Sequence, residues 1–357
     1  MTLGQLAVTV ALLGGLGLLA GRLGLSAIPA YLLAGLLLGP NEPRALSLVR
    51  PSEVTDFVAE LGIVFLLFFL GLEFTLGRLA RSRRHALVGG GVDLVVNGGL
   101  GLVVGLIAFG ASFAGLVLAA AIYVSSSAIT VKGLIDFRRL ADDETDLVLA
   151  ILVAEDVVIA LVLGLAAGGG ALVLAKAIGF VAVALAASRW LSRPIDLVLD
   201  RLPREFFLLA VFAFLVGMAA VAEKLGLSEA IGALMAGVIL SETSVREEIE
   251  ERFFSFRDVF AALFFFAFGL SIDLGALGRL GWLLALAVPL TIIGKSAGGF
   301  LAGLVGGFSR RQSLNAGLAL IAHGEFTIIL AQIASENDQL SHAVQAKLVA
   351  FSGLYVL

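Results

Sequence analysis

Cysteine is absent from the 357-residue sequence, histidine occurs three times, and charged residues make up only 15% of the chain. Without cysteine there can be no disulfide, no thiol catalysis and no iron–sulfur cluster. The histidines, His85, His323 and His342, are too few and too scattered to form a zinc site. An ordinary soluble domain carries about a quarter charged residues. The low charge therefore excludes a soluble globular enzyme.

Hydrophobic residues make up 60% of the sequence and occur in long runs. A membrane-spanning helix needs about 20 such residues, whereas the strands of a membrane barrel alternate apolar and polar residues over about ten positions. The sequence therefore predicts an all-α polytopic membrane protein with 13 transmembrane helices. Their centres are expected near residues 11, 33, 63, 97, 120, 157, 180, 213, 235, 263, 293, 324 and 350. The segments at 28–39 and 230–240 are short, and we expect the last helix to be truncated at Leu357.

Lysine and arginine concentrate in alternate loops between these segments. By the positive-inside rule the basic loops are cytoplasmic, which predicts an outside N-terminus and a cytoplasmic C-terminus in the plasma or inner membrane of a bacterium. Residues 1–5 lack the basic start of a secretory signal, so we expect the first helix to be retained. A cytoplasmic C-terminus would permit a regulatory domain or subunit. The basic loops include Arg78, Arg81, Arg83 and Arg84; Lys132, Arg138 and Arg139; Arg189, Arg193, Arg201 and Arg204; and Arg246, Arg252 and Arg257.

Two stretches of the first half recur in the second. Residues 23–40 match residues 225–242 at an offset of 202 positions, and residues 68–79 match residues 266–277 at an offset of 198. Shared glycine and leucine composition is the alternative explanation, but two matches at nearly the same offset favour a duplication. The copies are displaced by seven predicted spans, an odd number, so the second enters the membrane upside down. This predicts two inverted-topology six-helix repeats, as in secondary transporters.

Polar residues interrupt the apolar pattern at equivalent places in the two repeats. The fifth segment carries YVSSSAITV at residues 123–131, with Ser126 and Ser127 near its centre. A shift of 198 positions takes Ser127 to Glu325, within IAHGEFTI at residues 321–328. Serines in membrane helices can simply bond to carbonyls one turn earlier. The equivalence instead favours two crossed broken helices, where freed backbone and helix ends can hold ions.

Charged residues within apolar segments are costly and therefore usually functional. Glu155 and Asp156 are adjacent, and two neighbouring carboxylates in a low dielectric cannot both be ionised without a cation. One carboxylate that binds either a proton or a cation is what a proton/cation exchanger needs. The alternative is an acid pair held permanently in a salt bridge. The candidates are Asp93, Glu155, Asp156, Lys176, Lys295 and Glu325.

Lys295 is the expected counter-charge for this acidic pair, because it lies well inside a helix of the second repeat. A shift of 198 positions relates it to Asn97, and Asp93 lies one turn before Asn97. Two interpretations of Asp93 stay open, since it could line the same core or bond a helix break. Lys176 in the seventh segment is interpreted as a lysine that snorkels or faces solvent.

With these residues in view, the chain resembles the Kef-like branch of the monovalent cation:proton antiporters over nearly its whole length. The resemblance implies a homodimer and an elevator mechanism, in which a core slides against a dimerisation domain. The matching stretches are AYLLAGLLLGP, FLLFFLGLEF, SSSAITVKGL, AEDVV, LSEAIGALMAGVILSE, FFFAFGLSIDL, GKSAGG and HGEFTIIL. The implied domains are dimerisation helices at 1–84 and 205–279, core helices at 85–169 and 280–357, and a connector helix at 170–204.

The resemblance also implies roles for single residues. Asp156 matches the carrier of cation and proton, and Ser127 matches the hydroxyl residue at the fifth-helix break. Lys295 matches the basic partner of the acidic cluster, and Glu325 matches the glutamate of the GEF motif. Glu155 departs from the pattern, because Kef-type members carry glutamine there and electrogenic sodium antiporters carry aspartate. Ion selectivity and stoichiometry therefore stay open.

The sequence thus predicts an antiporter of K⁺ or Na⁺ for protons, with Asp156 as the shared site and membrane lipid and a second copy as partners. We expect Glu155 and Lys295 to form an intramembrane pair and the exchange to be electroneutral. The main alternative is a sodium-coupled symporter of organic anions, and a third is a membrane sensor or structural subunit without transport. The residues predict no catalysis, cofactor or nucleic-acid binding.

Overall fold

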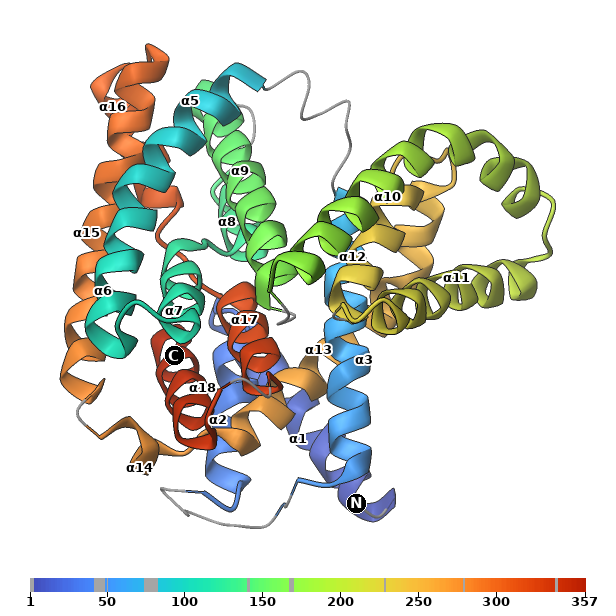
Figure 1. The fold of residues 1–357 in the computed structure, drawn as a ribbon, viewed down its shortest axis with the longest axis horizontal. Helices are drawn as coiled ribbons and strands as arrows, with labels where there is room; N and C mark the ends of the chain where they lie inside the picture. The colour runs from blue at the N-terminus through green and yellow to red at the C-terminus, as the bar shows by residue number, and fades with distance from the viewer. Residues whose placement is uncertain are drawn as a thin grey trace. The chain divides into compact units, whose positions relative to one another are not determined.

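A computed structural model describes residues 3–41, 49, 51–73, 83–139, 142–166, 170–227, 229–278, 280–337 and 340–357. Within these ranges every regular element is helical, which confirms the predicted all-α class (Figure 1). The helices of the first half are α1 (Leu3–Arg22), α2 (Ile28–Leu38), α3 (Glu53–Glu73), α5 (Arg83–Asp93), the π-helical η1 (Leu94–Gly98), α6 (Gly99–Phe109), α7 (Phe113–Tyr123), α8 (Ser127–Asp136) and α9 (Asp143–Ala166). Those of the second half are α10 (Gly170–Leu199), α11 (Arg204–Lys224), α12 (Glu229–Leu240), α13 (Arg246–Ser271), α14 (Leu274–Leu277), α15 (Leu280–Gly306), α16 (Arg310–Ala319), α17 (Glu325–Ser335) and α18 (His342–Val356).

Each predicted apolar segment has its centre in one of these helices or at a helix interruption. By length and composition, five helices of the described residues are long and apolar enough to cross a membrane. Others are shorter, among them α2 and α12, which cover the two segments that the sequence marks as short. The five long spans are Glu53–Leu72, Leu87–Phe109, Glu205–Lys224, Arg246–Ser271 and Leu280–Gly306.

The chain divides into two compact units. The first unit comprises Met1–Pro51, Leu79–Val162 and Phe265–Leu357, and the second comprises Ser52–Arg78 and Leu163–Phe264. Every residue of the candidate site described below belongs to the first unit. The predicted dimerisation, connector and core domains are functional assignments, and they stay predictions.

Glycines allow helix backbones to approach closely at two related places. In the first unit, a Cβ atom added to Gly35 of α2 would collide with the backbone of Gly269 in α13. In the second unit, a Cβ atom added to Gly237 of α12 would collide with the backbone of Gly71 in α3. Gly237 lies 202 positions after Gly35, and Gly269 lies 198 positions after Gly71. The same kind of contact therefore joins residues that the sequence repeat relates.

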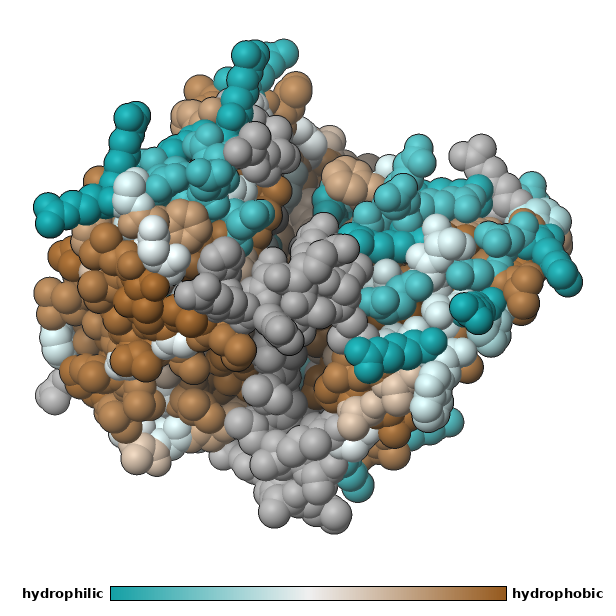
Figure 2. All heavy atoms as spheres, turned by 90° about the horizontal axis from the view of Figure 1, so that it is seen from above, coloured by the Kyte–Doolittle hydropathy of each residue, from teal (hydrophilic) through white to brown (hydrophobic). Residues whose placement is uncertain are grey.

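In the first unit the continuous run α5–η1–α6 packs along α15, as Figure 1 shows. Gly105 of α6 lies against the backbone of α7, and Gly303 of α15, 198 positions later, lies against Ser313 of α16. The outer faces of these helices are apolar, with Val95 76% exposed and Ile293 64% exposed. Figure 2 likewise shows apolar side chains over much of the visible surface. Such a surface suits contact with lipid rather than water.

Candidate functional site

Two interrupted helices form the centre of the site. Helix α7 ends at Tyr123 and α8 begins at Ser127, while α16 ends at Ala319 and α17 begins at Glu325. The first interruption lies within the predicted stretch 123–131, and the second, at residues 320–324, overlaps the predicted stretch 321–328. The extended segments meet, because the amide of Ser126 donates a 2.7 Å hydrogen bond to the carbonyl of Ala322.

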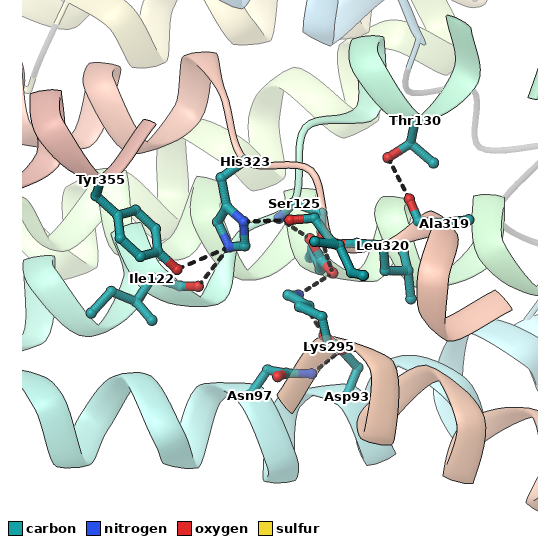
Figure 3. Close-up of polar contacts among 12 residues, drawn as sticks. Asp93, Asn97, Ile122, Ser125, Thr130, Lys295, Ala319, Leu320, His323 and Tyr355 are labelled. Carbon is teal, nitrogen blue, oxygen red and sulfur yellow. Dashed lines mark hydrogen bonds and ion pairs between the residues drawn. The ribbon is translucent and has the colours of Figure 1, made fainter. Parts of the chain in front are cut away.

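Side chains from each interrupted helix cap the carbonyls at the end of the other. The last turn of a helix leaves carbonyls without partners, and such groups are costly away from water. Three hydroxyls donate across the interruption, and Figure 3 shows two of these bonds. They run from Ser125 Oγ to Leu320 O at 2.9 Å, from Thr130 Oγ1 to Ala319 O at 3.0 Å, and from Thr327 Oγ1 to Ala121 O at 2.7 Å.

The beginnings of α8 and α17 share a different link. Ser126 Oγ accepts a 3.3 Å hydrogen bond from the amide of Ile129, in the first turn of α8. The same hydroxyl donates to Glu325 Oε2 at 3.0 Å. Glu325 is the first residue of α17, where the helix dipole favours a negative charge. Its buried carboxylate therefore joins the positive ends of both half-helices.

Glu155 of α9 joins the first interruption to Lys295 of α15. Its Oε1 atom accepts a 2.7 Å hydrogen bond from Lys295 Nζ, and both side chains have no exposed surface. Ser125 Oγ lies 3.0 Å from Oε1, so its single proton serves Glu155 or Leu320 at any one time. The amide of Ser125 donates to Oε2. The contact between Glu155 and Lys295 that the sequence predicts is therefore present in the structure.

Lys295 has a second carboxylate beside it. Asp93 Oδ2 lies 3.4 Å from Lys295 Nζ and is fully buried. Asn97 Nδ2 donates a 2.7 Å hydrogen bond to Asp93 Oδ1, and Asn97 is positioned by the π-helical segment Leu94–Gly98. The ammonium also lies 5.0 Å from the centre of the Tyr123 ring. Of the two interpretations of Asp93, the structure supports the one in which it lines the core.

The glycines that flank Lys295 explain how these side chains fit. Gly294 and Gly298 lie on one face of α15, four residues apart, opposite the amide of Asn97. A Cβ atom at either position would crowd the Asn97 side chain. The GKSAGG stretch therefore brings α15 close enough to the π-helical segment for Lys295 to reach Asp93.

Asp156 and Ser127 complete the predicted set. Asp156 follows Glu155 on α9 and is 5% exposed. Ser127 Oγ is buried and has no hydrogen-bond partner among the described residues. Those residues also contain no group of three or more His, Cys, Asp or Glu side chains that could hold a metal ion. Chemically, the region offers carboxylate, hydroxyl and backbone oxygens around a buried lysine.

Several of the side chains that bond across the interruptions are not predicted from the sequence. His323 is weighed there only as a metal ligand, yet its ring contacts Ile122 O and Ile321 O. A shift of 198 positions from Ser125 arrives at His323 and could have indicated it. Thr130 and Thr327 give no such signal. Lys176 is exposed, belongs to the second unit and donates a 3.1 Å hydrogen bond to the carbonyl of Leu225.

A profile of the family described as "Sodium/hydrogen exchanger, transmembrane" matches residues 8–357. The chain therefore belongs to this family of membrane cation/proton antiporters. The sodium proton antiporter MjNhaP1 from Methanocaldococcus jannaschii has a similar structure, with a TM-score of 0.74 over 99% of this chain and 93% of that one. The two sequences are 17% identical, so this likeness concerns the fold alone.

Named relatives confirm the resemblance to the Kef-like branch. The K(+)/H(+) antiporter subunit KhtU of Bacillus subtilis is 38% identical over 353 residues, 95% of this chain and 86% of its own length. The ammonium/H(+) antiporter subunit AmhT of Alkalihalophilus pseudofirmus is 30% identical over 92% of this chain and 82% of its own. The glutathione-regulated potassium-efflux system protein KefC of Salmonella arizonae is 32% identical over 72% of this chain and 43% of its own. These names do not support the organic-anion symporter.

Proposed function

We propose that this chain exchanges K⁺ or Na⁺ for protons and that Asp156 holds one or the other in turn. The observation that carries this proposal is a pair of adjacent buried acids, Glu155 and Asp156, of which Glu155 contacts Lys295. Glu155 accepts hydrogen bonds from Lys295 and from the amide of Ser125, and thereby holds the first interruption in place. Its neighbour Asp156 is the acid that we assign to the transported ion.

The proposed ligands of the cation are oxygen atoms near Asp156. A monovalent cation gives up part of its water and takes oxygen ligands in exchange. Ser127 supports this assignment, because its buried hydroxyl has no hydrogen-bond partner among the described residues. Ser126 and Glu155 border the same interruption and complete the proposed ion- and proton-binding set. A proton on Asp156 would remove the negative charge that attracts the cation, so the two ions compete.

The contacts of Lys295 support an electroneutral exchange of one proton for one cation. An unpaired charge at this depth would cost several kcal/mol. Lys295 lies between Glu155 at 2.7 Å and Asp93 at 3.4 Å, so it keeps a carboxylate beside it even if one contact lengthens. In this proposal Lys295 stays charged throughout the cycle, and only Asp156 alternates.

The proposed architecture is 13 membrane-spanning helices in two inverted repeats with an elevator motion. It is supported by the paired glycine contacts, Gly35 with Gly269 and Gly71 with Gly237. Shifts of 202 and 198 positions relate the glycines of one contact to those of the other. It is supported further by Ala121 and Ala319, which are also 198 positions apart and both accept a threonine hydroxyl from the opposite helix. Matched contacts of this kind are what a duplicated six-helix unit would produce.

The proposed setting is a homodimer in the lipid of a bacterial plasma membrane, with an outside N-terminus and a cytoplasmic C-terminus. KhtU and AmhT are named as antiporter subunits, which supports a regulatory subunit or domain for this chain as well. The relatives are named for potassium, ammonium or sodium. We assign the alkali cations K⁺ and Na⁺ to this chain, and no cofactor.

The test is proton flux in proteoliposomes, followed with a pH-sensitive dye after addition of K⁺, Na⁺ or Rb⁺. The wild-type protein is expected to move protons across the membrane in response to at least one of these three cations. Asp156→Asn is expected to abolish this flux while leaving the protein folded. An amide takes up no proton and lacks the negative charge that attracts a cation. Asp146→Asn is the matched control, since Asp146 is an exposed acid on the same helix. Cation-driven flux in Asp156→Asn would refute the assignment.

A further inference from the structure

His323 lies in the segment between α16 and α17, with both ring nitrogens against oxygen atoms. Nε2 is 3.0 Å from the carbonyl oxygen of Ile122, in the last turn of α7. Nδ1 is 2.8 Å from the carbonyl oxygen of Ile321. Figure 3 shows the ring at the centre of this polar group, with the Tyr355 hydroxyl 3.4 Å from Nε2. The ring therefore connects the second interruption to the end of α7.

The contact with Ile122 repeats a contact made at the other interruption. A shift of 198 positions takes Ser125 to His323 and Ile122 to Leu320. Ser125 Oγ lies 2.9 Å from Leu320 O, and His323 Nε2 lies 3.0 Å from Ile122 O. Equivalent positions therefore reach equivalent carbonyls. The difference is chemical, because a hydroxyl stays neutral, whereas an imidazole can bind a second proton and become charged.

The neighbouring hydroxyls indicate where the protons of the ring belong. Thr291 Oγ1 donates to the carbonyl of Ala287 at 2.8 Å, so it accepts from the Tyr355 hydroxyl at 2.7 Å. Tyr355 has no second proton to give to His323, and Ile122 O can only accept. Nε2 must therefore carry a proton if either contact is a hydrogen bond.

Nδ1 faces Ile321 O, which also can only accept. A neutral imidazole has one N–H group and can satisfy one of the two carbonyls, whereas an imidazolium satisfies both. The negative end of the α7 dipole also favours a positive ring. Burial of the ring opposes a positive charge most strongly, and the positive charge of Lys295 on α15 opposes it as well. The other titratable side chains of the site are Asp93 on α5, Tyr123 on α7, Glu155 and Asp156 on α9, Glu325 on α17 and Tyr355 on α18.

We propose that His323 is a positioning residue that caps α7 through Nε2–H, as Ser125 caps α16. When Nδ1 takes up a second proton, the ring also donates a hydrogen bond to Ile321 O within its own segment. This inference rests on the proposed antiport and adds to it a second pH response beside that of Asp156. The second proton fixes the interruption, so it slows exchange at acid pH without occupying the ion site. The effect therefore falls on kcat and leaves the apparent KM for the cation unchanged.

Two variants, assayed in proteoliposomes, separate the hydrogen bond of His323 to Ile122 O from its uptake of a second proton. His323→Gln keeps an amide donor that can reach Ile122 O but cannot take up a proton, so kcat at alkaline pH should be retained and its fall at acid pH should weaken. His323→Leu has no donor and should lower kcat about tenfold at every pH, as the loss of one hydrogen bond would. An unchanged kcat profile in His323→Gln, or equal rates for both variants, would overturn the proposal.

Nitrogen-15 NMR of histidine-labelled protein tests the cap without any transport. The sequence has only two other histidines, so His85→Gln together with His342→Gln leaves His323 as the single signal. The expected neutral form carries its proton on Nε2 and gains a second one on Nδ1 as the pH falls. A neutral form with its proton on Nδ1 would overturn the cap and leave the antiport assignment intact. Absence of cation-driven flux in the wild-type protein would reject the antiport assignment and leave the NMR result valid.

Discussion

The two helix interruptions of the first unit have the same backbone plan and different chemistry. Residues 124–126 carry serines, and residues 320–324 carry a histidine and a glycine directly before Glu325. Both place side chains on the carbonyls that end the opposite half-helix. The first interruption is anchored to a buried carboxylate on α9, while the second reaches a tyrosine on α18. The two interruptions thus share a hydrogen-bond arrangement, while the second carries a histidine where the first carries a serine.

The largest effect is expected from breaking the anchor that only the first interruption has. Glu155→Ala removes the acceptor of Lys295 and of the Ser125 amide. Removing one partner of a buried ion pair costs about 3–5 kcal/mol, and we expect the lower end because Asp93 stays beside Lys295. The measurement is the midpoint of thermal unfolding in detergent.

Glu155→Gln is the matched control for that change. Its amide oxygen can still accept from Lys295 or Ser125, so both stability and exchange should be partly retained. Equal destabilisation by alanine and glutamine would show that the negative charge matters and the hydrogen bonds do not. Complete loss of exchange in a stable Glu155→Gln protein would make Glu155 an ion carrier in its own right.

A smaller effect is expected from Ser127 and Glu325, which occupy equivalent positions after the two interruptions. Ser127→Ala removes a proposed cation ligand and should raise the apparent KM for the cation about tenfold or less, the cost of one hydrogen-bonding group. Glu325→Gln keeps an acceptor for Ser126 Oγ and should leave KM unchanged. The measurement is exchange rate against cation concentration. An unchanged KM for every alkali cation in Ser127→Ala would leave this serine with a packing role only.

The smallest effect is expected from removing the two threonine caps. These caps are the contacts in which the two interruptions are most alike. Thr130→Val and Thr327→Val each remove one hydroxyl that bonds a carbonyl across the interruption. Hydrogen bonds between membrane helices contribute about 0.6 kcal/mol on average. Each variant should therefore lose a similar, small amount of thermal stability. A large loss in one variant alone would show that the two interruptions are not equivalent.

The helical class, both interruptions and the contact between Glu155 and Lys295 could be predicted from the sequence. These predictions succeed because polar and charged residues are rare in long apolar runs, so each one stands out. The repeat offset adds information, since a constant shift of 198 positions relates Ser127 to Glu325. Such signals depend only on the order of residues along the chain.

Other parts of the site depend on proximity in three dimensions, and the sequence could not supply it. Asp93 could line the core or bond a helix break, and only its distance from Lys295 decides between them. The π-helical turn that positions Asn97 has no composition that distinguishes it from ordinary helix. Thr130 and Thr327 look like ordinary helical threonines until the opposite carbonyl is located. The capping bonds of these two threonines could therefore not be predicted from the sequence.

The central claim is that a proton and a cation compete for Asp156. The most direct measurement is the apparent KM for K⁺ and Na⁺ in wild-type proteoliposomes at several pH values, with the membrane potential clamped to zero. Competition predicts that KM rises as the pH falls, by up to about tenfold per pH unit once the site is mostly protonated. It also predicts that saturating cation overcomes this rise in KM. A KM that is independent of pH, or proton and cation bound together, would contradict the account.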